Sequence, residues 1–181
     1  FDLGRAPTTR DVARLVKDGG LEALPDARRR GDAATYQEIR CRSALNRVKG
    51  MPFFKWTLNP YRGCTHGCHY CFARQYQTQL ELNAGDHFAS VILVKTNFVE
   101  VLRRELDKPT WMKEPIGFGT ATDPYQPIEG RYRLSRGVLE ALVDAATPVG
   151  IVTKGPLIVR DIDLLRDLSK RSSCRIPISV P

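Results

Sequence analysis

Two kinds of apolar pattern alternate along the chain from about residue 51 onward. Short continuous apolar runs predict buried strands, and runs with an apolar residue every three or four positions predict amphipathic helices. The predicted strands cover residues 56–59, 91–95, 116–119, 149–153 and 175–180. The predicted helices cover residues 72–82, 97–106 and 135–146, and a further helix begins at residue 161. Ser135 and Asp161 are residue types typical of helix N-caps, so we expect them to cap the last two helices.

The order of these elements predicts the fold class. Strands that are apolar on both faces must be covered on both faces, and strands that alternate with helices usually form a parallel sheet. The sequence therefore predicts an α/β fold, and the pattern alone does not choose between an open sheet and a barrel. In both architectures ligands bind at the carboxyl ends of the strands, so the loops after the strands are where we look for chemistry.

The first 50 residues are polar, rich in Arg and weakly patterned. We interpret residues 1–50 as a basic N-terminal appendage and residues 51–181 as the core. Within the appendage, residues 9–18 are compatible with a short helix and residues 35–42 with an extended segment. The chain starts with Phe1, and its last predicted strand runs into Pro181. We therefore expect a piece of a longer protein, with a core that is incomplete at its C-terminal end.

Charge and hydropathy narrow the classes of partner. The chain has 28 Lys and Arg against 20 Asp and Glu, which gives a net charge of +8. This charge is spread along the chain, a pattern compatible with a nucleic-acid partner or with an ordinary basic surface. The longest apolar run, from Val91 to Val94, is far shorter than the roughly 20 residues of a membrane span, and no apolar signal core begins the chain. We expect a cytoplasmic protein with no membrane partner.

Three of the five cysteines follow the first predicted strand in the spacing C-x3-C-x2-C: Cys64, Cys68 and Cys71. An odd number of cysteines with this crowding argues against a disulfide framework and for a metal or cluster site in a reducing compartment. Zinc and iron–sulfur clusters both take thiolate ligands. For zinc, a fourth ligand could be His66, His69 or Cys41. Three cysteines without a clear fourth suit a [4Fe–4S] cluster with one open iron, and the spacing leaves both possibilities open.

This motif, with an aromatic residue (Tyr70) before its last cysteine, resembles the signature of the radical S-adenosylmethionine (SAM) superfamily. Over about residues 43–181, other segments are similar to bacterial radical SAM proteins related to spore photoproduct lyase. These segments are residues 59–64, 68–74, 94–95, 119–127, 153–155 and 160–161. The resemblance implies a partial (β/α)6 TIM-like barrel, the radical SAM core, which is truncated here after its fifth strand.

The resemblance also implies a site. It places three irons of a [4Fe–4S] cluster on the three cysteines of the motif and SAM on the fourth iron. The residues implied to contact SAM are Tyr70, Thr122, Lys154 and Ser179. An external one-electron donor such as flavodoxin or ferredoxin would reduce the cluster, which would cleave SAM to methionine and a 5′-deoxyadenosyl radical. That radical would take a hydrogen atom from a substrate, and no protein residue is assigned a catalytic role.

One position departs from the lyase pattern. Thr120 stands where the lyase has a cysteine that returns a hydrogen atom to the product, and a threonine O–H is a much poorer donor than a thiol. The lyase reaction is therefore not expected, and the substrate stays open, with nucleic acid as one candidate. Lys95, at the end of the second predicted strand, should face the same rim. The alternative function is a zinc- or cluster-stabilised nucleic-acid-binding module without catalysis, which the charge and the cysteine/histidine loop suggest.

Overall fold

A computed structural model describes residues 34–80 and 87–177, and its larger sheet has five strands. In sheet order these are β2 (Asn46–Arg47), β3 (Trp56–Leu58), β6 (Ile116–Phe118), β7 (Val149–Ile151) and β8 (Cys174–Arg175). Strands β3, β6, β7 and β8 are parallel to one another, and β2 pairs antiparallel with β3. The structure thus confirms a mixed α/β fold with parallel strands.

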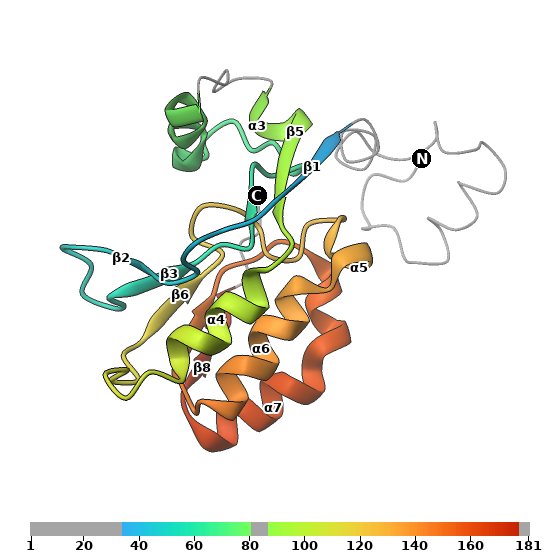
Figure 1. The fold of residues 1–181 in the computed structure, drawn as a ribbon. Helices are drawn as coiled ribbons and strands as arrows, with labels where there is room; N and C mark the ends of the chain where they lie inside the picture. Colours follow the sequence, from blue (N-terminus) through green and yellow to red (C-terminus); the bar gives the residue numbers. More distant parts are fainter. Residues whose placement is uncertain (1–33, 81–86, 178–181) are drawn as a thin grey trace, which may run out of the picture.

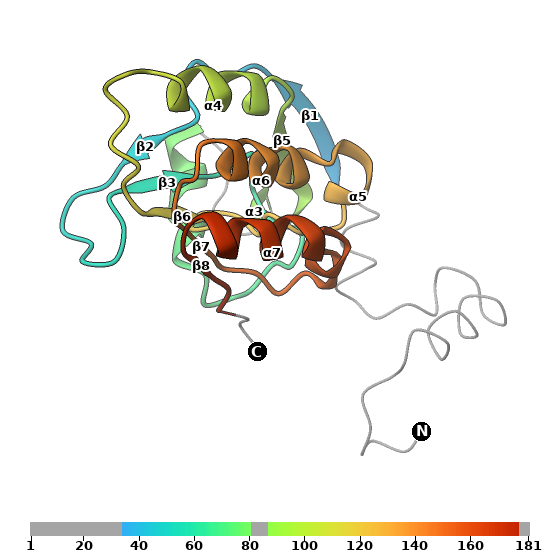
Figure 2. The same cartoon turned by 90° about the horizontal axis from the view of Figure 1, so that it is seen from below.

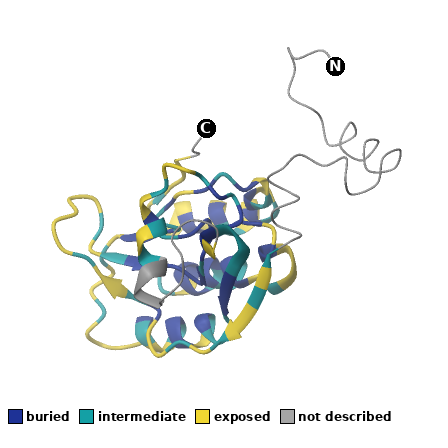
Figure 3. Ribbon diagram, turned by 90° about the horizontal axis from the view of Figure 1, so that it is seen from above, coloured by how far each residue is buried: buried dark blue, intermediate teal, exposed yellow. Residues whose placement is uncertain are grey.

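Three helices cover one face of this sheet: α4 (Phe98–Leu106), α6 (Leu134–Asp144) and α7 (Ile162–Arg171). They lie side by side in that order in both views of the ribbon (Figures 1 and 2). Helices α6 and α7 each connect two neighbouring strands of the sheet. Because β3, β6 and β7 are parallel, their carboxyl ends meet at one edge. The large apolar cluster between sheet and helices includes Leu58, Leu102, Phe118, Leu139 and Leu168. Figure 3 shows these inward faces as buried, in contrast to the exposed positions on β1.

A second sheet holds β5 (Val91–Lys95), which has β1 (Thr35–Ile39) on one side and β4 (Tyr61–Arg62) on the other. We expected residues 91–95 to join the same parallel sheet as the other strands, and that part of the prediction is wrong. The reason lies in the two residues Asn59 and Pro60, which separate β3 from β4 and redirect the chain so that β4 pairs antiparallel with β5. The described strands therefore do not form a single run of five consecutive barrel strands.

The extended segment expected at residues 35–42 is confirmed over Thr35–Ile39, where β1 pairs in parallel with β5. Strand β2 comes from the same N-terminal region and extends the larger sheet. The predicted helix at residues 9–18 lies outside the described residues, and the division of the chain at residue 50 stays a prediction. In the parts of the chain that the structure describes, every helix is too short or too polar to cross a membrane.

Several element boundaries differ from expectation. The segment expected as a helix over residues 72–82 is a 3-10 helix, η2 (Phe72–Leu80), as far as it is described. Ser135 and Asp161 do not cap their helices through their side chains, because both side chains bond elsewhere. The last predicted strand is observed only as Cys174–Arg175, and residues 178–181 lie outside the described part. Three short helical segments complete the described fold: α3 (His87–Ser90), α5 (Glu129–Tyr132) and η3 (Pro156–Asp161).

Candidate functional site at the carboxyl ends of the strands

The cysteine loop follows β3 and β4, and two glycines permit its shape. Gly63 has φ of 84°, and a Cβ there would lie 2.5 Å from the first carbonyl oxygen of β5, so a larger residue would be strained. Gly67 also has a positive φ, 60°. The N–H of Gly67 donates to the carbonyl of Cys64 (3.1 Å), and the N–H of Cys71 donates to the carbonyl of Cys68 (3.2 Å). The chain therefore turns twice between the first and last cysteine of the motif.

Arg74 and Phe88 hold the cysteine loop in place through hydrogen bonds to its backbone. The Arg74 guanidinium donates to the carbonyls of Cys68 (2.8 Å) and Gly67 (2.5 Å), and it lies 5.1 Å from the centre of the Phe88 ring. The N–H of Cys64 donates to the Phe88 carbonyl at 2.8 Å. These bonds satisfy backbone groups that the turns leave unpaired, so they fix the loop conformation.

Thr122 and Gln126, from the loop after β6, clamp the start of the cysteine loop. The Thr122 hydroxyl donates to the Gly63 carbonyl at 2.6 Å, and Gln126 Nε2 lies within hydrogen-bond distance of the same carbonyl (3.3 Å). The N–H of Thr65 donates to Gln126 Oε1 at 3.1 Å. Gln126 is fully buried. The Thr122 hydroxyl, which was expected to contact SAM, therefore supports the loop.

Asp123 joins the loops after β6 and β7. Its Oδ1 accepts from the Thr153 hydroxyl (2.6 Å), and its Oδ2 accepts from the Lys154 N–H (2.7 Å). His66 Nε2 lies 3.2 Å from the same Oδ2. Burial alone would raise the pKa of Asp123, but the hydrogen bonds from His66, Lys154 and Thr153 outweigh it and hold this pKa below its ordinary value. The Asp123 carboxylate thus connects three segments, which are the loops after β6 and β7 and the cysteine loop.

The three cysteines of the motif differ in burial. Cys64 is buried and packs with Ala73 and Phe88, and Cys71 lies against the same cluster. Burial raises the pKa of Cys64 to about 12, so its thiolate needs a nearby positive charge. Cys68 is half-buried, and Lys154 Nζ lies 3.4 Å from its sulfur.

Within residues 34–80 and 87–177, no three His, Cys, Asp or Glu side chains are gathered in a geometry that could hold a metal ion. The donor chemistry still fits an iron–sulfur cluster, because three thiols stand on one loop whose backbone is held by other side chains. Cluster binding therefore requires the three sulfurs to converge and to lose their protons.

The structure brings together two of the four residues expected to contact SAM. Lys154, directly after β7, hydrogen-bonds to the Tyr70 hydroxyl, and its Nζ lies 4.8 Å from the centre of the Tyr70 ring. The bond to Tyr70, followed by the contact with the Cys68 sulfur, raises the pKa of Lys154. Thr122 lies on the neighbouring loop, and Ser179 is outside the described residues.

A cavity of about 400 Å³ opens beside the cysteine loop. Its lining includes Gly63 and Ala73, which flank the motif, and Asn59, which follows β3. The Asn59 side chain bridges to the loop after β6: its Nδ2 lies 3.3 Å from the Thr120 hydroxyl, and its Oδ1 accepts from the Ala121 N–H at 2.8 Å. Thr120, the position that departs from the lyase pattern, therefore lines this cavity.

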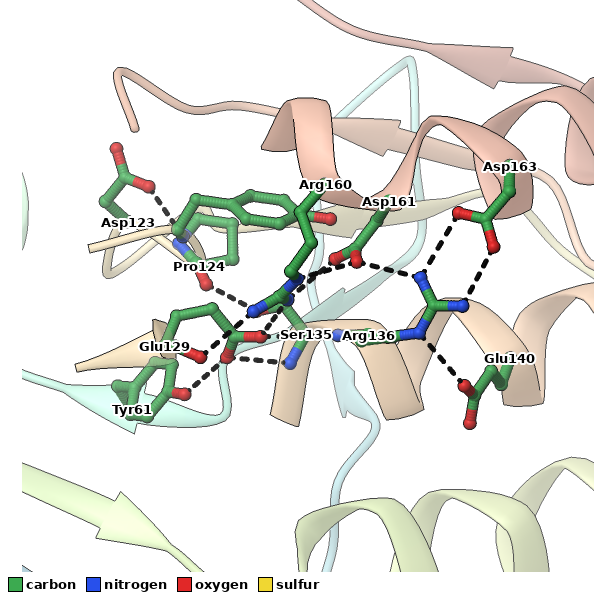
Figure 4. A network of polar contacts seen from close by, with 11 residues as sticks. Tyr61, Asp123, Pro124, Glu129, Ser135, Arg136, Glu140, Arg160, Asp161 and Asp163 are labelled. Carbon is green, nitrogen blue, oxygen red and sulfur yellow. Dashed lines mark hydrogen bonds and ion pairs between the residues drawn. The ribbon is translucent and has the colours of Figure 1, made fainter. Parts of the chain in front are cut away.

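A buried ionic network lies behind the loop that carries Thr122 and Asp123 (Figure 4). The Glu129 carboxylate, which is fully buried, accepts from the Tyr61 hydroxyl (2.5 Å), the Ser135 N–H (2.9 Å) and the Arg160 guanidinium (2.7 Å). Burial, followed by the charge of Glu129, raises the pKa of Tyr61 far above its ordinary range. Tyr61 therefore stays a neutral donor to this carboxylate.

Asp161 is the second buried carboxylate of the network. It accepts two hydrogen bonds from Arg160, both 2.8 Å, and one from Arg136 at 3.0 Å. The Ser135 hydroxyl, next to Arg136, donates to the Pro124 carbonyl. The network thus anchors the loop of Asp123 and Pro124 to helix α6 and to η3, and every carboxylate buried in it is paired.

Sequence reasoning found the cysteines but missed most of the side chains that shape their loop. Arg74 and Gln126 stand only within the segments of the resemblance, where neither is predicted to shape the loop, and Glu129 is not predicted at all. Gln126 and Glu129 contact groups that are distant in the sequence, so no local spacing of residues predicts their roles. No signal in the sequence marks them, because each stands close to other polar residues.

Comparisons of the sequence find similar proteins that are uncharacterised. No model of a known protein family matches the chain. An uncharacterised protein of Mycobacterium tuberculosis is 43% identical over 178 residues, which cover 91% of this chain and 50% of that protein. An uncharacterised protein of Methanocaldococcus jannaschii is 30% identical over 132 residues, 73% of this chain and 47% of that protein. The chain thus spans about half the length of the curated relatives it matches.

Among solved structures, the chain is similar to spore photoproduct lyase complexed with dinucleoside spore photoproduct. The TM-score is 0.59 at 17% identity, and the match covers 87% of this chain and 43% of the lyase chain. A mutant of the same lyase gives a TM-score of 0.57 at 18% identity with the same coverage. The chain therefore has a mixed α/β fold similar to part of spore photoproduct lyase.

Proposed function

We propose that this chain carries the core of a radical SAM enzyme, in which Cys64, Cys68 and Cys71 bind a [4Fe–4S] cluster. The observation that supports this most strongly is the cysteine loop itself, which follows strand β3 and is clamped by the loop after β6 in a fold similar to spore photoproduct lyase. When bound, the cluster and SAM supply reductive cleavage of SAM to a 5′-deoxyadenosyl radical.

In this proposal SAM binds on the side of the loop where Tyr70, Thr122 and Lys154 lie, with Ser179 as a further contact. The Lys154 ammonium pairs with the SAM carboxylate, and Asp123 orients the residue by accepting its N–H. Tyr70, within the loop, contacts the adenine mostly through its backbone, and the Thr122 hydroxyl, which bonds the Gly63 carbonyl, positions the cofactor. The buried walls around Cys64 keep water from a reactive radical.

The finer architecture also belongs to this proposal. Strands β3, β6, β7 and β8 correspond to strands of a partial (β/α)6 barrel, and residues 51–181 belong to the radical SAM core. The partners are SAM and an external one-electron donor such as flavodoxin or ferredoxin. A nucleic-acid substrate is supported by the net charge and by the dinucleoside bound to the lyase, and a reducing cytoplasm suits the unpaired thiols.

The decisive experiment is anaerobic reconstitution of the full chain with iron and sulfide, followed by metal analysis and an assay for 5′-deoxyadenosine. We expect about four irons per chain and SAM cleavage in the presence of dithionite. Cys68→Ala should lose both, while Cys174→Ala, which removes a thiol outside the motif, should retain both.

Wild-type chain that yields no 5′-deoxyadenosine, or a Cys68→Ala variant with unchanged yield, contradicts the proposal. One zinc per chain without iron would instead support the alternative, a nucleic-acid-binding module without catalysis.

A further inference from the structure

The cavity beside the cysteine loop has a positive lining that the proposed SAM contacts do not use. It is lined by the two cations Lys95 and Arg62, by the aromatic residues Phe54, Phe72 and Tyr76, and by polar residues that include Thr120. Among the described residues that line it, none is Asp or Glu. Tyr70, Thr122 and Lys154 are not part of the lining either. The cavity is therefore a positively charged space distinct from the side where we place SAM.

Lys95 is the side chain that defines this space. Its Nζ donates to the Asn59 carbonyl at 2.6 Å and lies 5.4 Å from the centre of the Phe98 ring. The titratable groups that act on it are Cys41, a neutral thiol whose own pKa is raised by burial, and Arg62, a like charge. Burial is the main cause that lowers the pKa of Lys95, and the charge of Arg62 lowers it further.

The Lys95 ammonium, in this largely buried position, can still bind an anion. It has three N–H donors, and one of them has a protein acceptor among the described residues. No carboxylate of the described part of the chain balances its charge. Charged groups withdrawn from water are usually paired, and the attraction between opposite charges is stronger where apolar walls exclude solvent. The missing partner is then a negatively charged group of a ligand.

We propose that this cavity binds an oxyanion of the substrate, a carboxylate or a phosphate, and that Lys95 is the residue that pairs with it. The volume is within the range of small-molecule sites, and the aromatic walls suit a substrate with an apolar or aromatic body next to its anion. The assignment of this ligand as the substrate rests on the proposed function, but binding of the anion requires only the cavity.

A purely structural role for Lys95 makes a different prediction. If the ammonium served only to bond the Asn59 carbonyl at the end of β3, its replacement would lower stability and leave ligand preference unchanged. Lys95→Met keeps the length of the side chain and removes the charge. Lys95→Arg keeps the charge. Lys170→Met removes one positive charge from an exposed position on α7, so it controls for the net charge of the molecule.

The test measures binding of matched probes to the folded, cluster-free full chain by isothermal titration calorimetry. One pair is thymidine 5′-monophosphate and thymidine, and the other is benzoate and benzyl alcohol. We expect the charged member of at least one pair to bind about tenfold more tightly than its neutral partner, as one charge-assisted hydrogen bond would produce. The pair that shows the preference identifies the anion as phosphate or carboxylate.

Lys95→Met should abolish this preference, whereas Lys95→Arg and Lys170→Met should retain it. Equal binding of charged and neutral probes to the wild-type chain would overturn the inference, as would a preference that survives in Lys95→Met or disappears equally in Lys170→Met. Displacement of the charged probe by L-methionine would also overturn it, because the anion would then be the carboxylate of SAM. None of these outcomes depends on 5′-deoxyadenosine formation, so the proposed function stands or fails separately.

Discussion

Gly63 shows how a single residue shapes the site. Its left-handed backbone and the nearby carbonyl oxygen of Val91 leave no room for a side chain. Gly50 also has a positive φ, 77°, but a Cβ there would meet nothing within 4 Å. A side chain at Gly50 would therefore meet backbone strain alone, whereas a side chain at Gly63 would meet backbone strain and a steric clash.

We predict that Gly63→Ala lowers the free energy of unfolding by more than about 2 kcal/mol, since a left-handed backbone costs a non-glycine residue roughly 1–2 kcal/mol before any clash is added. Gly50→Ala should cost only this backbone strain of about 1–2 kcal/mol, because nothing lies within 4 Å of its Cβ. Urea denaturation of both variants measures the difference. Equal losses would mean that the chain around Val91 shifts without cost.

At the scale of single residues, the sequence predicts the metal-ligating cysteines more readily than the side chains that hold their loop in place. The motif of Cys64, Cys68 and Cys71 could be recognised in the sequence because its cysteines are only three or four positions apart. The resemblance implied Thr122 as a SAM contact, but its observed partner, the Gly63 carbonyl, could not be inferred because it depends on how two distant loops pack. Whether Thr122 also contacts a cofactor stays a prediction.

At the scale of elements, the Glu129–Arg160–Asp161 network connects α5, η3 and α6. We predict that Arg160→Met lowers the free energy of unfolding by about 3 kcal/mol or more, because it removes the cation that Glu129 and Asp161 share in the interior. The matched control is Arg103→Met, whose salt bridge with Asp144 lies at the surface and should contribute at most about 1 kcal/mol. Thermal or urea unfolding gives both values, and similar losses in the two variants would count against a structural role for the network.

The same network predicts a pH dependence. Burial would raise the pKa of Asp161, but the bonds from Arg160 and Arg136 outweigh it, so the pKa in the folded chain lies below its ordinary value. A lowered pKa means that the carboxylate stabilises the fold at pH above about 4 and that this contribution disappears as pH falls through the folded-state pKa.

Asp161→Asn should therefore be less stable than the wild type by about 3 kcal/mol at pH 7, and the gap should close in acid as the wild-type carboxylate is protonated. Unfolding curves between pH 7 and the acid limit of folding measure the gap. If the difference in free energy of unfolding between the two proteins stays constant with pH, the packing of the Asp161 side chain and not its charge stabilises the fold.

The elements themselves were predicted well where apolar periodicity decides them. Strand β5 and helix α4 fall where the pattern placed them, to within a residue. The strands that pair with β5 could not be predicted in the same way. A continuous apolar run shows that β5 is buried but does not say which strands lie beside it in the sheet. The antiparallel pairing of β4 with β5 depends on a change of chain direction at Asn59 and Pro60, which no periodicity encodes.

At the scale of the whole molecule, the apolar interior divides into separate clusters with different tasks. The large cluster between the five-stranded sheet and the helices holds Leu139, which is fully buried in α6. A much smaller cluster of Cys64, Ala73 and Phe88 lies under the cysteine loop. Since proteins open in contiguous units with different free energies, we expect the small cluster to open more easily than the helix layer.

Paired substitutions test this division. Leu139→Ala should lower the free energy of global unfolding by about 2–5 kcal/mol and speed hydrogen exchange throughout α4, α6 and α7. Phe88→Ala should instead speed exchange by about tenfold or more at the amides of Cys64 and its loop, reduce the iron bound after reconstitution, and leave exchange in α6 near its wild-type rate. The reason is that the variant removes the Phe88 ring, which packs with Cys64 and lies against Arg74, while the backbone carbonyl that accepts from Cys64 stays in place. Among the described residues, the members of this cluster are not part of the large cluster under the helices. If Phe88→Ala accelerated exchange in α6 as strongly as in the loop, the site and the scaffold would be one cooperative unit, and loop and fold could not be changed independently.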